Sequence, residues 1–535
     1  MARRRRPRLH PRHTDHDRAV PRADRLQGRP RHLRLLRPRA VRGQRRRSDG
    51  DARAHARGAG HDRLAAGRGA RLGVLQRTVG SGARRGRQVS GATAALLAAR
   101  TVGPVWDRSA DDRAGYDAGR SGFNLALDHR PDLVLAAQVP SDVAAGIRFA
   151  AEQGLTVELQ ATGHGAHRAM DGGLLITTRA LTEVSVDPAR RVARISAGAT
   201  SADVLAATAP HGLTAPVGSA ATVGYVSYSL GGGLGMLGRA HGYAADRIRA
   251  LQVVTADGRE LSVSSEHHPE LFWGLRGGGG KLAAVTAIDV ELIPLSELYG
   301  GGLFFDGVRG VELIEAFRSC IVTAPRELSL SIAFLRFPRV PTVPETLRGR
   351  YCGHVRVAYL GEAARGARLI AGLRALPTLL DTVRTMPVTD LASVHADPRN
   401  PMPVCTDSVA LRGERALDRL PALLDPDAPF VLELRHLGGA LVDQPAHPNA
   451  VGHRAAELNL FTSAYPGTDR GGAAAAQRRV TGALAELSVG GPLRNFLPSG
   501  AADASACYEP GLAVELARLA TRWDPSDVFA FAPAL

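Results

Sequence analysis

Six glycines fall within fifteen residues of this 535-residue chain, at positions 224, 231, 232, 233, 235 and 238. A segment with so little side chain cannot bury the apolar surface of a core helix or strand, so it must be a loop. Glycine-rich loops let the backbone approach a ligand and offer its N–H groups to phosphate oxygens. Part of the loop also reads G-x-G-x-x-G, with Asp257 further on. We disfavour a Rossmann site, because the following LGRAHGYAADR is interrupted by Gly242 and has little apolar face.

A second glycine-flanked turn, residues 161–166, directly follows the predicted strand LTVELQ at 155–160. Gly163 and Gly165 have no Cβ, so this turn can also bring backbone N–H groups to an anion. His164, between them, is held beside whatever the turn binds. A single Gly-His-Gly taken alone is more often a surface turn.

Helical and strand patterns surround these loops. Residues 141–153 have apolar side chains at helical spacing, with Ser141 as the predicted N-cap and Gly154 as the terminating glycine. A hairpin is predicted to turn at Asp257-Gly258. From 300 to 470, alternating strands and Ala/Leu/Arg-rich helices are typical of an antiparallel sheet covered by helices on one side, and the predicted fold class is α+β.

The positive charge of the chain is concentrated at one end. Residues 1–100 hold 28 Arg, 6 Asp and neither Lys nor Glu, a net of +22, and the first aromatic residue is Trp106. Such a segment cannot offset its conformational entropy by burial, so we expect disorder. A basic tail, a solvated linker and a start codon assigned too far upstream all explain it, and the lopsided composition favours the last. The other 435 residues carry a net of −5, which makes nucleic acid an unlikely partner.

Cysteine spacing and hydropathy argue against a metal-binding, a disulfide-rich and a membrane-spanning protein. The four cysteines lie far apart, at 320, 352, 405 and 507, so we expect thiols and neither a metal site nor a disulfide framework. No apolar run approaches the ~20 residues of a membrane span. The basic opening MARRRRPRLH is not followed by the apolar stretch of a signal peptide. We expect a soluble, cytoplasmic protein without membrane contact.

Six segments resemble one family in their order and spacing. They are the strand with its GHG turn, DGGLLI, TVGY…LGGGLG, GYAADRI…VVTADG, PELFWGLRGGGG and the C-terminal RWDPSDVFAF. Over residues 101–535 the chain resembles the FAD-linked oxidases of the vanillyl-alcohol oxidase superfamily, with a PCMH-type FAD-binding domain, and among them the berberine-bridge-enzyme-like branch. The resemblance implies a two-subdomain FAD-binding domain at 101–298, a substrate domain at 299–490 with a helix-covered antiparallel sheet, and a segment at 491–535 that returns to the FAD domain.

The resemblance also implies cofactor contacts. His164 matches the histidine that the family bonds to the flavin 8α methyl. Many members add a second bond from a cysteine two residues before the Thr of TVG; Ala220 stands there, so we expect a single covalent bond. The other expected FAD contacts lie in both loops and two later segments: Thr162, Gly163, Gly165, Ala166, Ser219, Thr222, Val223, Gly224, Gly231, Gly232, Gly233, Gly235, Val285 and Asn495.

Three departures from the family pattern concern the site. Lys281-Leu282-Ala283 replaces the usual Asn-Phe-Gly, and its bulk is expected to loosen the flavin fit. Leu493 replaces a tyrosine that helps to deprotonate the substrate, although the Asn-Phe of that motif is kept. Ala532 replaces a usual asparagine.

Hydride leaves an alcohol or amine carbon only if a base takes the heteroatom proton. The resemblance places the base or orienting groups on the strand 431–439. There Glu433 and Arg435 share one face and His436 points to the other. We favour Glu433 with Arg435, although a surface ion pair would explain both, and His436 is the remaining candidate. Tyr508 or Tyr465 could replace the missing phenol, although each also fits a core-edge tyrosine.

The function that the resemblance implies is that of an FAD-dependent oxidase or dehydrogenase. It would take hydride from a small alcohol, sugar or secondary metabolite and pass electrons to oxygen or another acceptor. The alternative is a catalytically impaired flavin-fold protein that only binds a ligand, which Leu493 and Ala532 suggest. A nucleic-acid binder that acts through the arginine-rich segment is the least favoured class.

Overall fold

The computed structural model describes residues 91–109, 111–465 and 469–535. The disorder predicted for residues 1–90 lies outside the described residues. Residues 91–98 form helix α1 (Gly91–Ala98), which buries Leu97 against β1 and α3. The predicted disorder is therefore wrong for this part of the segment, whose alanines and leucines supply the buried face.

A four-stranded sheet follows α1, in the order β1-β2-β4-β3. Its strands are β1 (Val105–Asp107), β2 (Leu133–Ala136), β3 (Val157–Gln160) and β4 (Leu174–Thr177), with β2, β4 and β3 parallel and β1 antiparallel to β2. Helix α2 (Arg113–Arg120) lies between β1 and β2 in sequence, and α3 (Pro140–Gln153) connects β2 to β3. The helix α3 ends at Gly154 in the left-handed conformation, as predicted.

Helix α3 begins at Pro140 with Val139 as its N-cap, so the prediction of Ser141 in that position is wrong. The side chain of Asp142, which is 1% exposed, takes over the capping. Its carboxylate accepts hydrogen bonds from four backbone N–H groups, those of Val102, Gly103, Gln138 and Val139. One carboxylate thus satisfies the backbone donors just before the helix and ties the chain before β1 to it.

A second, antiparallel sheet has five strands in the order β5-β6-β10-β8-β9. They are β5 (Val184–Asp187), β6 (Val192–Ser196), β8 (Ile248–Val254), β9 (Glu260–Ser264) and β10 (Ala284–Glu291), and β8 with β9 forms the predicted hairpin. The core on this sheet includes residues of α4 (Ser201–Thr208), α5 (Tyr225–Leu230), α7 (Pro269–Gly278) and α13 (Pro510–Trp523). Helix α6 (Gly238–His241) and a ribbon of β7 (Leu213–Thr214) with β11 (Ile293–Pro294) complete this half.

The third sheet has eight strands in the order β15-β12-β14-β13-β18-β19-β17, with β16 beside β12. The bounds are β12 (Glu297–Asp306), β13 (Leu328–Arg336), β14 (Tyr351–Tyr359), β15 (Thr378–Asp381), β16 (Arg384–Pro387), β17 (Cys405–Leu411), β18 (Phe430–His436) and β19 (Leu458–Ala464). The helices of this part are α8 (Gly310–Val322), α9 (Ala363–Leu369), α10 (Ala371–Arg374), α11 (Ala416–Arg419) and α12 (Arg470–Ala483).

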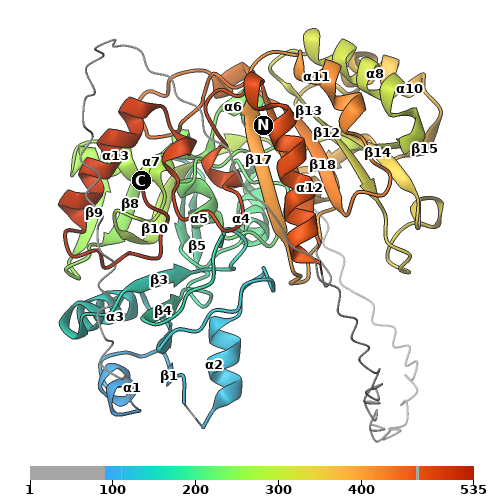
Figure 1. Cartoon of the computed structure of the whole chain (residues 1–535). Helices are drawn as coiled ribbons and strands as arrows, with labels where there is room; N and C mark the ends of the chain where they lie inside the picture. Colours follow the sequence, from blue (N-terminus) through green and yellow to red (C-terminus); the bar gives the residue numbers. More distant parts are fainter. Residues whose placement is uncertain (1–90, 110, 466–468) are drawn as a thin grey trace, which may run out of the picture. The chain divides into compact units, whose positions relative to one another are not determined.

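The two faces of the large sheet have opposite character. One face carries aliphatic and aromatic residues that share a core with α8, α10, α11 and α12, and Figure 1 shows these helices gathered beside the sheet. The opposite face carries polar side chains at the alternate positions, among them Ser331, His354, Arg356, Glu433 and Arg435. The predicted helix-covered antiparallel sheet is thus confirmed, and its polar face is left for other contacts.

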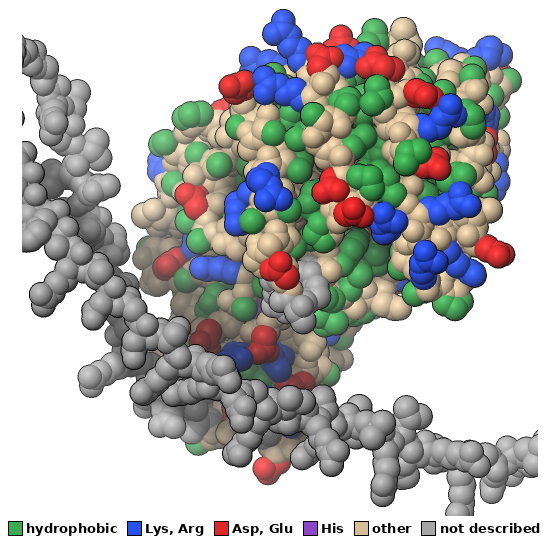
Figure 2. Space-filling view, turned by 45° about the vertical axis from the view of Figure 1, so that its right-hand side comes forward, with side chains coloured by type: hydrophobic (Ala, Val, Ile, Leu, Met, Phe, Trp, Pro, Cys, Tyr) green, Lys and Arg blue, Asp and Glu red, His purple; other side chains and the backbone are tan. Residues whose placement is uncertain are grey.

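Among the described residues no helix is long enough to cross a bilayer, and charges of both signs share the face shown in Figure 2. On the face shown in Figure 2, basic and acidic side chains are interspersed, with no broad area of one sign. The helices α3, α12 and α13, with 14 residues each, fall short of the ~20 residues needed to cross a bilayer, and no other described helix qualifies.

We predict that Asp142→Ala lowers the free energy of unfolding by about 3 kcal/mol, because backbone donors at a buried helix end lose their acceptor. Asp203→Ala is the matched control: Asp203 caps α4 at an exposed position and should cost about 1 kcal/mol. Urea unfolding followed by circular dichroism measures both. Equal losses in the two variants would show that Asp142 acts only as an ordinary cap.

Candidate functional site

The turn after β3 holds His164 in a defined position. Gly163 has φ 78°, and a Cβ there would lie 2.6 Å from the Cα of Gly122, so only glycine fits. The His164 ring stacks on Phe123 with centroids 3.7 Å apart and an interplanar angle of 18°. Its Nδ1 lies 2.9 Å from the Thr162 hydroxyl, and its Nε2 lies 3.1 Å from the Thr222 hydroxyl.

These contacts join the two loops that the sequence singled out. Thr162 and His164 belong to the first loop and Thr222 to the second, and the N–H of Gly224 also donates to the Thr162 hydroxyl over 3.3 Å. Burial lowers the pKa of His164 to about 4, an effect partly opposed by the carboxylate of Asp397. The imidazole is therefore neutral at neutral pH. Because hydroxyls both donate and accept, either ring nitrogen can carry the proton.

The backbone of both loops offers unused hydrogen-bond donors. The N–H groups of residues 163–165 and 219–222 donate no hydrogen bond to another described residue. Such groups in a half-buried loop need an acceptor from elsewhere. A Cβ built on Gly165 would meet nothing within 4 Å, so the turn borders open space. The residues present thus fit the diphosphate of FAD.

The prediction that residues 224–238 form a loop throughout is wrong, because Tyr225–Leu230 forms helix α5 and its apolar side chains are in the core. The glycines that follow α5 do form a loop, which is fixed by its own packing and by Asn495. The Asn495 side chain accepts from the N–H of Gly233 over 2.6 Å and donates to the carbonyl of Tyr228 over 3.0 Å. Gly232 and Gly233 have positive φ, and a Cβ on Gly235 would lie 2.1 Å from the carbonyl oxygen of Val217. Close packing within the protein therefore explains part of this glycine run.

The other residues predicted to contact FAD lie either in the apolar core or in the two loops. Val285 is buried inside β10 in the apolar core. Ser219, Ala220 and Val223 are half-buried beside the free N–H groups of the second loop, and Gly231 lies against the Asn495 side chain. Ala166 is half-buried at the end of the first loop.

The segment that departs from the family pattern is well packed. Leu282 and Ala283 are fully buried in the core. The Lys281 ammonium bonds the Asp527 carboxylate at 2.5 Å and the Phe529 carbonyl at 3.1 Å. These bonds fasten the C-terminal segment to the glycine run of α7. The looser flavin fit expected from this segment stays a prediction.

The polar face of the large sheet holds a buried ionic cluster around Glu433. Arg435 contacts both oxygens of this carboxylate, at 3.0 and 3.1 Å, and Arg356 Nη1 lies 2.9 Å from Oε1. His395 Nε2 lies 3.3 Å from the same oxygen. Glu433 is 4% exposed, so the ion pair considered from the sequence is present but is not at the surface.

The cluster has one ionised acid and two neutral imidazoles. Burial raises the pKa of Glu433, but Arg435 and Arg356 more than offset this and hold it well below its usual range. Burial and the neighbouring Arg356 lower the pKa of both His354 and His395. Glu433 is therefore a carboxylate whose lone pairs are engaged, which weakens it as a base.

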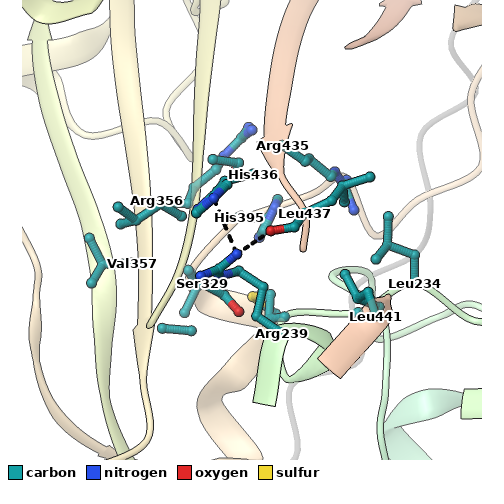
Figure 3. A pocket seen from close by; sticks show the side chains of 16 residues that line it. Leu234, Arg239, Ser329, Arg356, Val357, His395, Arg435, His436, Leu437 and Leu441 are labelled. Atoms are coloured by element: carbon teal, nitrogen blue, oxygen red, sulfur yellow. Dashed lines mark hydrogen bonds between the residues drawn. The ribbon is translucent and has the colours of Figure 1, made fainter. Parts of the chain in front are cut away.

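Of the remaining candidates from the sequence, Tyr465 lies near Glu433: burial and the carboxylates of Asp397 and Glu433 raise its pKa. His436 contacts Arg239 Nη1 over 3.1 Å, and it lines the same cavity as Arg435. Figure 3 shows both side chains beside this cavity. The buried Tyr508 donates to the carbonyl of Gly277 over 3.1 Å, which directs its hydroxyl to the end of α7. Leu493 is packed in an apolar cluster.

Several residues of this region carry no recognisable sequence signal. His395 and Asp397 lie on an irregular loop, with Ala396 between them at φ 55°. Phe123 precedes a bridge between Asn124 and Met402 that joins the cofactor half to this loop. Arg356 alternates with valines, a pattern equally typical of a solvated strand face.

Comparisons with known proteins agree with this geometry. Residues 131–264 match the family described as FAD binding domain. This part of the chain therefore carries an FAD binding domain. Among the relatives of the chain is (R)-6-hydroxynicotine oxidase of Paenarthrobacter nicotinovorans, 29% identical over 289 residues, which are 54% of this chain and 62% of the relative. Glucooligosaccharide oxidase of Sarocladium strictum is 29% identical over 42% of this chain and 46% of its own length. The chain thus spans less than two thirds of these curated relatives.

Solved structures establish the fold. The chain aligns with 6-hydroxy-D-nicotine oxidase of Arthrobacter nicotinovorans at a TM-score of 0.69 and 23% identity, over 80% of this chain and 96% of the other. The berberine-bridge-like protein 1 of Physcomitrella patens aligns at 0.70 and 17% identity, over 82% and 98%. Carbohydrate oxidase of Microdochium nivale aligns at 0.71 and 18% identity, over 83% and 99%. The predicted α+β fold with a PCMH-type FAD-binding domain is confirmed.

We predict that His436 makes the protein less stable in mild acid. Burial and Arg239 lower its pKa to about 3 in the fold, below the ~6.5 of an unfolded chain. The contribution of His436 to the free energy of unfolding is complete above pH ~6.5. It falls as the pH drops toward 3, by about 1–2 kcal/mol between pH 7 and 5. His436→Gln should remove this part of the pH dependence in urea unfolding, while the exposed His211→Gln leaves it intact. An unchanged slope in His436→Gln would contradict the assignment.

Proposed function

We propose that this protein is an FAD-dependent oxidoreductase that takes hydride from a small organic alcohol, with sugars and secondary metabolites among the candidate substrates. The observation that carries the proposal is the neutral His164, held between two hydroxyls where two loops with free backbone N–H groups meet. The FAD-binding match over residues 131–264 supports it. The named relatives are oxidases or oxidoreductases, and none of them favours a catalytically impaired ligand-binding protein.

His164 is the proposed covalent anchor of FAD. A solved relative is described as carrying a 6-S-cysteinyl, 8α-N1-histidyl FAD. In this chain Ala220 occupies the cysteine position, so we propose the histidyl bond alone. The low pKa of His164 supports this role, because only a neutral imidazole has a nitrogen lone pair to form the bond. Bound FAD supplies the acceptor for hydride.

The contacts of the Glu433 cluster favour His395 as the group that takes the substrate's proton. Its ring is neutral, and neither ring nitrogen has a well-aligned hydrogen-bond partner among the described residues. Glu433 lies beside Nε2 and would stabilise the imidazolium that forms, while Nδ1 is left to accept a proton. Glu433, Arg435 and His436, proposed from the sequence as catalytic, would then orient His395 and the substrate.

Two more predictions from the sequence remain proposals. We propose a cytoplasmic protein, and a place in secondary metabolism, on the composition and the resemblance alone. Oxygen or another small electron acceptor would complete the catalytic cycle.

We predict that the peptide containing His164 carries the mass of FAD. The purified protein should be yellow and keep its colour in the acid-precipitated pellet, because a covalent bond survives unfolding. His164→Ala should release its flavin on precipitation, whereas the control His211→Ala should not. Mass spectrometry of the digested protein decides the matter. An unmodified peptide from yellow protein would overturn the anchor, and colourless protein after refolding with FAD would overturn the enzyme.

We predict that His395→Gln slows flavin reduction by substrate about 10²-fold or more, the usual contribution of a positioned base. Flavin content should stay unchanged, because His395 is not on either cofactor loop. Stopped-flow absorbance measures the rate of flavin bleaching at a series of pH values. The step in rate that the wild type shows when His395 titrates should be absent from the variant. Reduction at the wild-type rate would exclude His395 as the base.

A further inference from the structure

A cationic cavity lies between the glycine loop and the polar face of the large sheet. Its volume is about 40 Å³, and its walls include Gly235 and Met236 on one side and residues of β13, β14 and β18 on the other. Three arginines and two histidines line it, and no aspartate or glutamate does: Arg239, Arg356, Arg435, His395 and His436. Figure 3 shows these side chains converging from both halves of the protein.

Arg239 brings a positive charge without an acidic partner. It is 5% exposed, and its guanidinium donates to the carbonyls of Ala324, Pro325, Leu328 and Leu437. No carboxylate of the described residues forms an ion pair with it, and the charge that acts on it is that of Arg326. Burial, with repulsion from Arg326, lowers its pKa to about 10, which leaves it charged at neutral pH.

Arg356 and Arg435 add more positive charge than Glu433 can balance. Both contact this one carboxylate, so two guanidinium groups share a single negative charge. Together with Arg239, the buried groups around the cavity have a surplus of two positive charges. Uncompensated buried charge is costly, and an anion in the cavity would offset it.

The cavity also has free donors and a suitable size. Arg356 Nη1 lacks a well-aligned hydrogen-bond acceptor among the described residues despite its proximity to Glu433. About 40 Å³ holds roughly two or three waters, which is room for the oxygens of a carboxylate but not for a sugar ring. The paired N–H groups of arginine match a carboxylate in geometry as well as in charge.

We propose that the substrate is a hydroxy acid whose carboxylate occupies this cavity between Arg356 and Arg435. The inference rests on the proposed function and specifies its substrate class. With the carboxylate there, the hydroxyl of the neighbouring carbon lies beside His395. The C–H bond gives hydride, with both electrons, to FAD, the O–H proton passes to His395, and the C–O bond becomes the carbonyl of an oxo acid.

The first test uses the wild-type holoenzyme with matched pairs of compounds. Lactate is compared with lactamide and mandelate with mandelamide, in anaerobic bleaching of the flavin. The acids should reduce the flavin at least about tenfold faster at low concentration, because the amides carry no charge. Equal rates for acid and amide would overturn the proposal. No folding defect can intervene, since no residue is changed.

The second test changes the arginines and follows binding without turnover. Benzoate should raise the melting temperature of the wild type and benzyl alcohol should not. Arg356→Met and Arg435→Met should each lose the benzoate shift, and Arg356→Lys should keep part of it. The matched control is Arg318→Met, which removes an arginine of helix α8 that pairs with Asp418 of α11. A benzoate shift retained in both methionine variants would place the anion elsewhere.

The two proposals can fail separately. If neither acids nor amides bleach the flavin but benzoate still stabilises only proteins with both arginines, the anion site stands and the oxidation of hydroxy acids is wrong. If neutral alcohols bleach the flavin as well as the acids do and benzoate has no effect, the oxidoreductase stands and the anion site is wrong.

Discussion

The neutral imidazole of His164 is the contact on which the cofactor half depends. Its two ring nitrogens reach hydroxyls on two loops that are 58 residues apart in sequence, and its face rests on Phe123. Protonation would remove the acceptor that one of these hydroxyls needs. Burial prevents protonation, so the same burial that fixes the ring also keeps its lone pair available. The two loops are thereby held at one spacing, with their free N–H groups beside them.

The large sheet supplies the second constraint, through simple alternation. Each inner strand must place apolar residues toward the helices, which leaves every second residue for the polar face. The strand register then places Ser331 of β13 between two arginines, with Arg435 of β18 on one side and Arg356 of β14 on the other. A cluster of charges from distant segments follows from pairing alone. The loop that carries His395 closes over it.

The sequence predicts what depends on local pattern. Helix α3, the β8–β9 hairpin and the helix-covered sheet follow from periodicity and glycine positions, and His164 follows from its place in an ordered set of motifs. The N-cap of α3 could not be predicted, because Val139 has no capping side chain and only the fold brings Val102 to Asp142, which caps in its place. The role of Arg356 was equally hidden, since nothing local distinguishes a buried polar face from a solvated one.

Charge balance connects the strand pairing of the large sheet with the chemistry of the site. Glu433 in isolation reads as a candidate base, but two guanidinium groups hold its pKa well below its usual range and make it a weak proton acceptor. The same pairing leaves the cluster with more positive than negative charge, at a place where water cannot screen it. A fold selected for stability alone would replace such a cluster with apolar residues, which are often as stable or more so. Its retention beside the glycine loop therefore indicates that the missing negative charge arrives with a ligand.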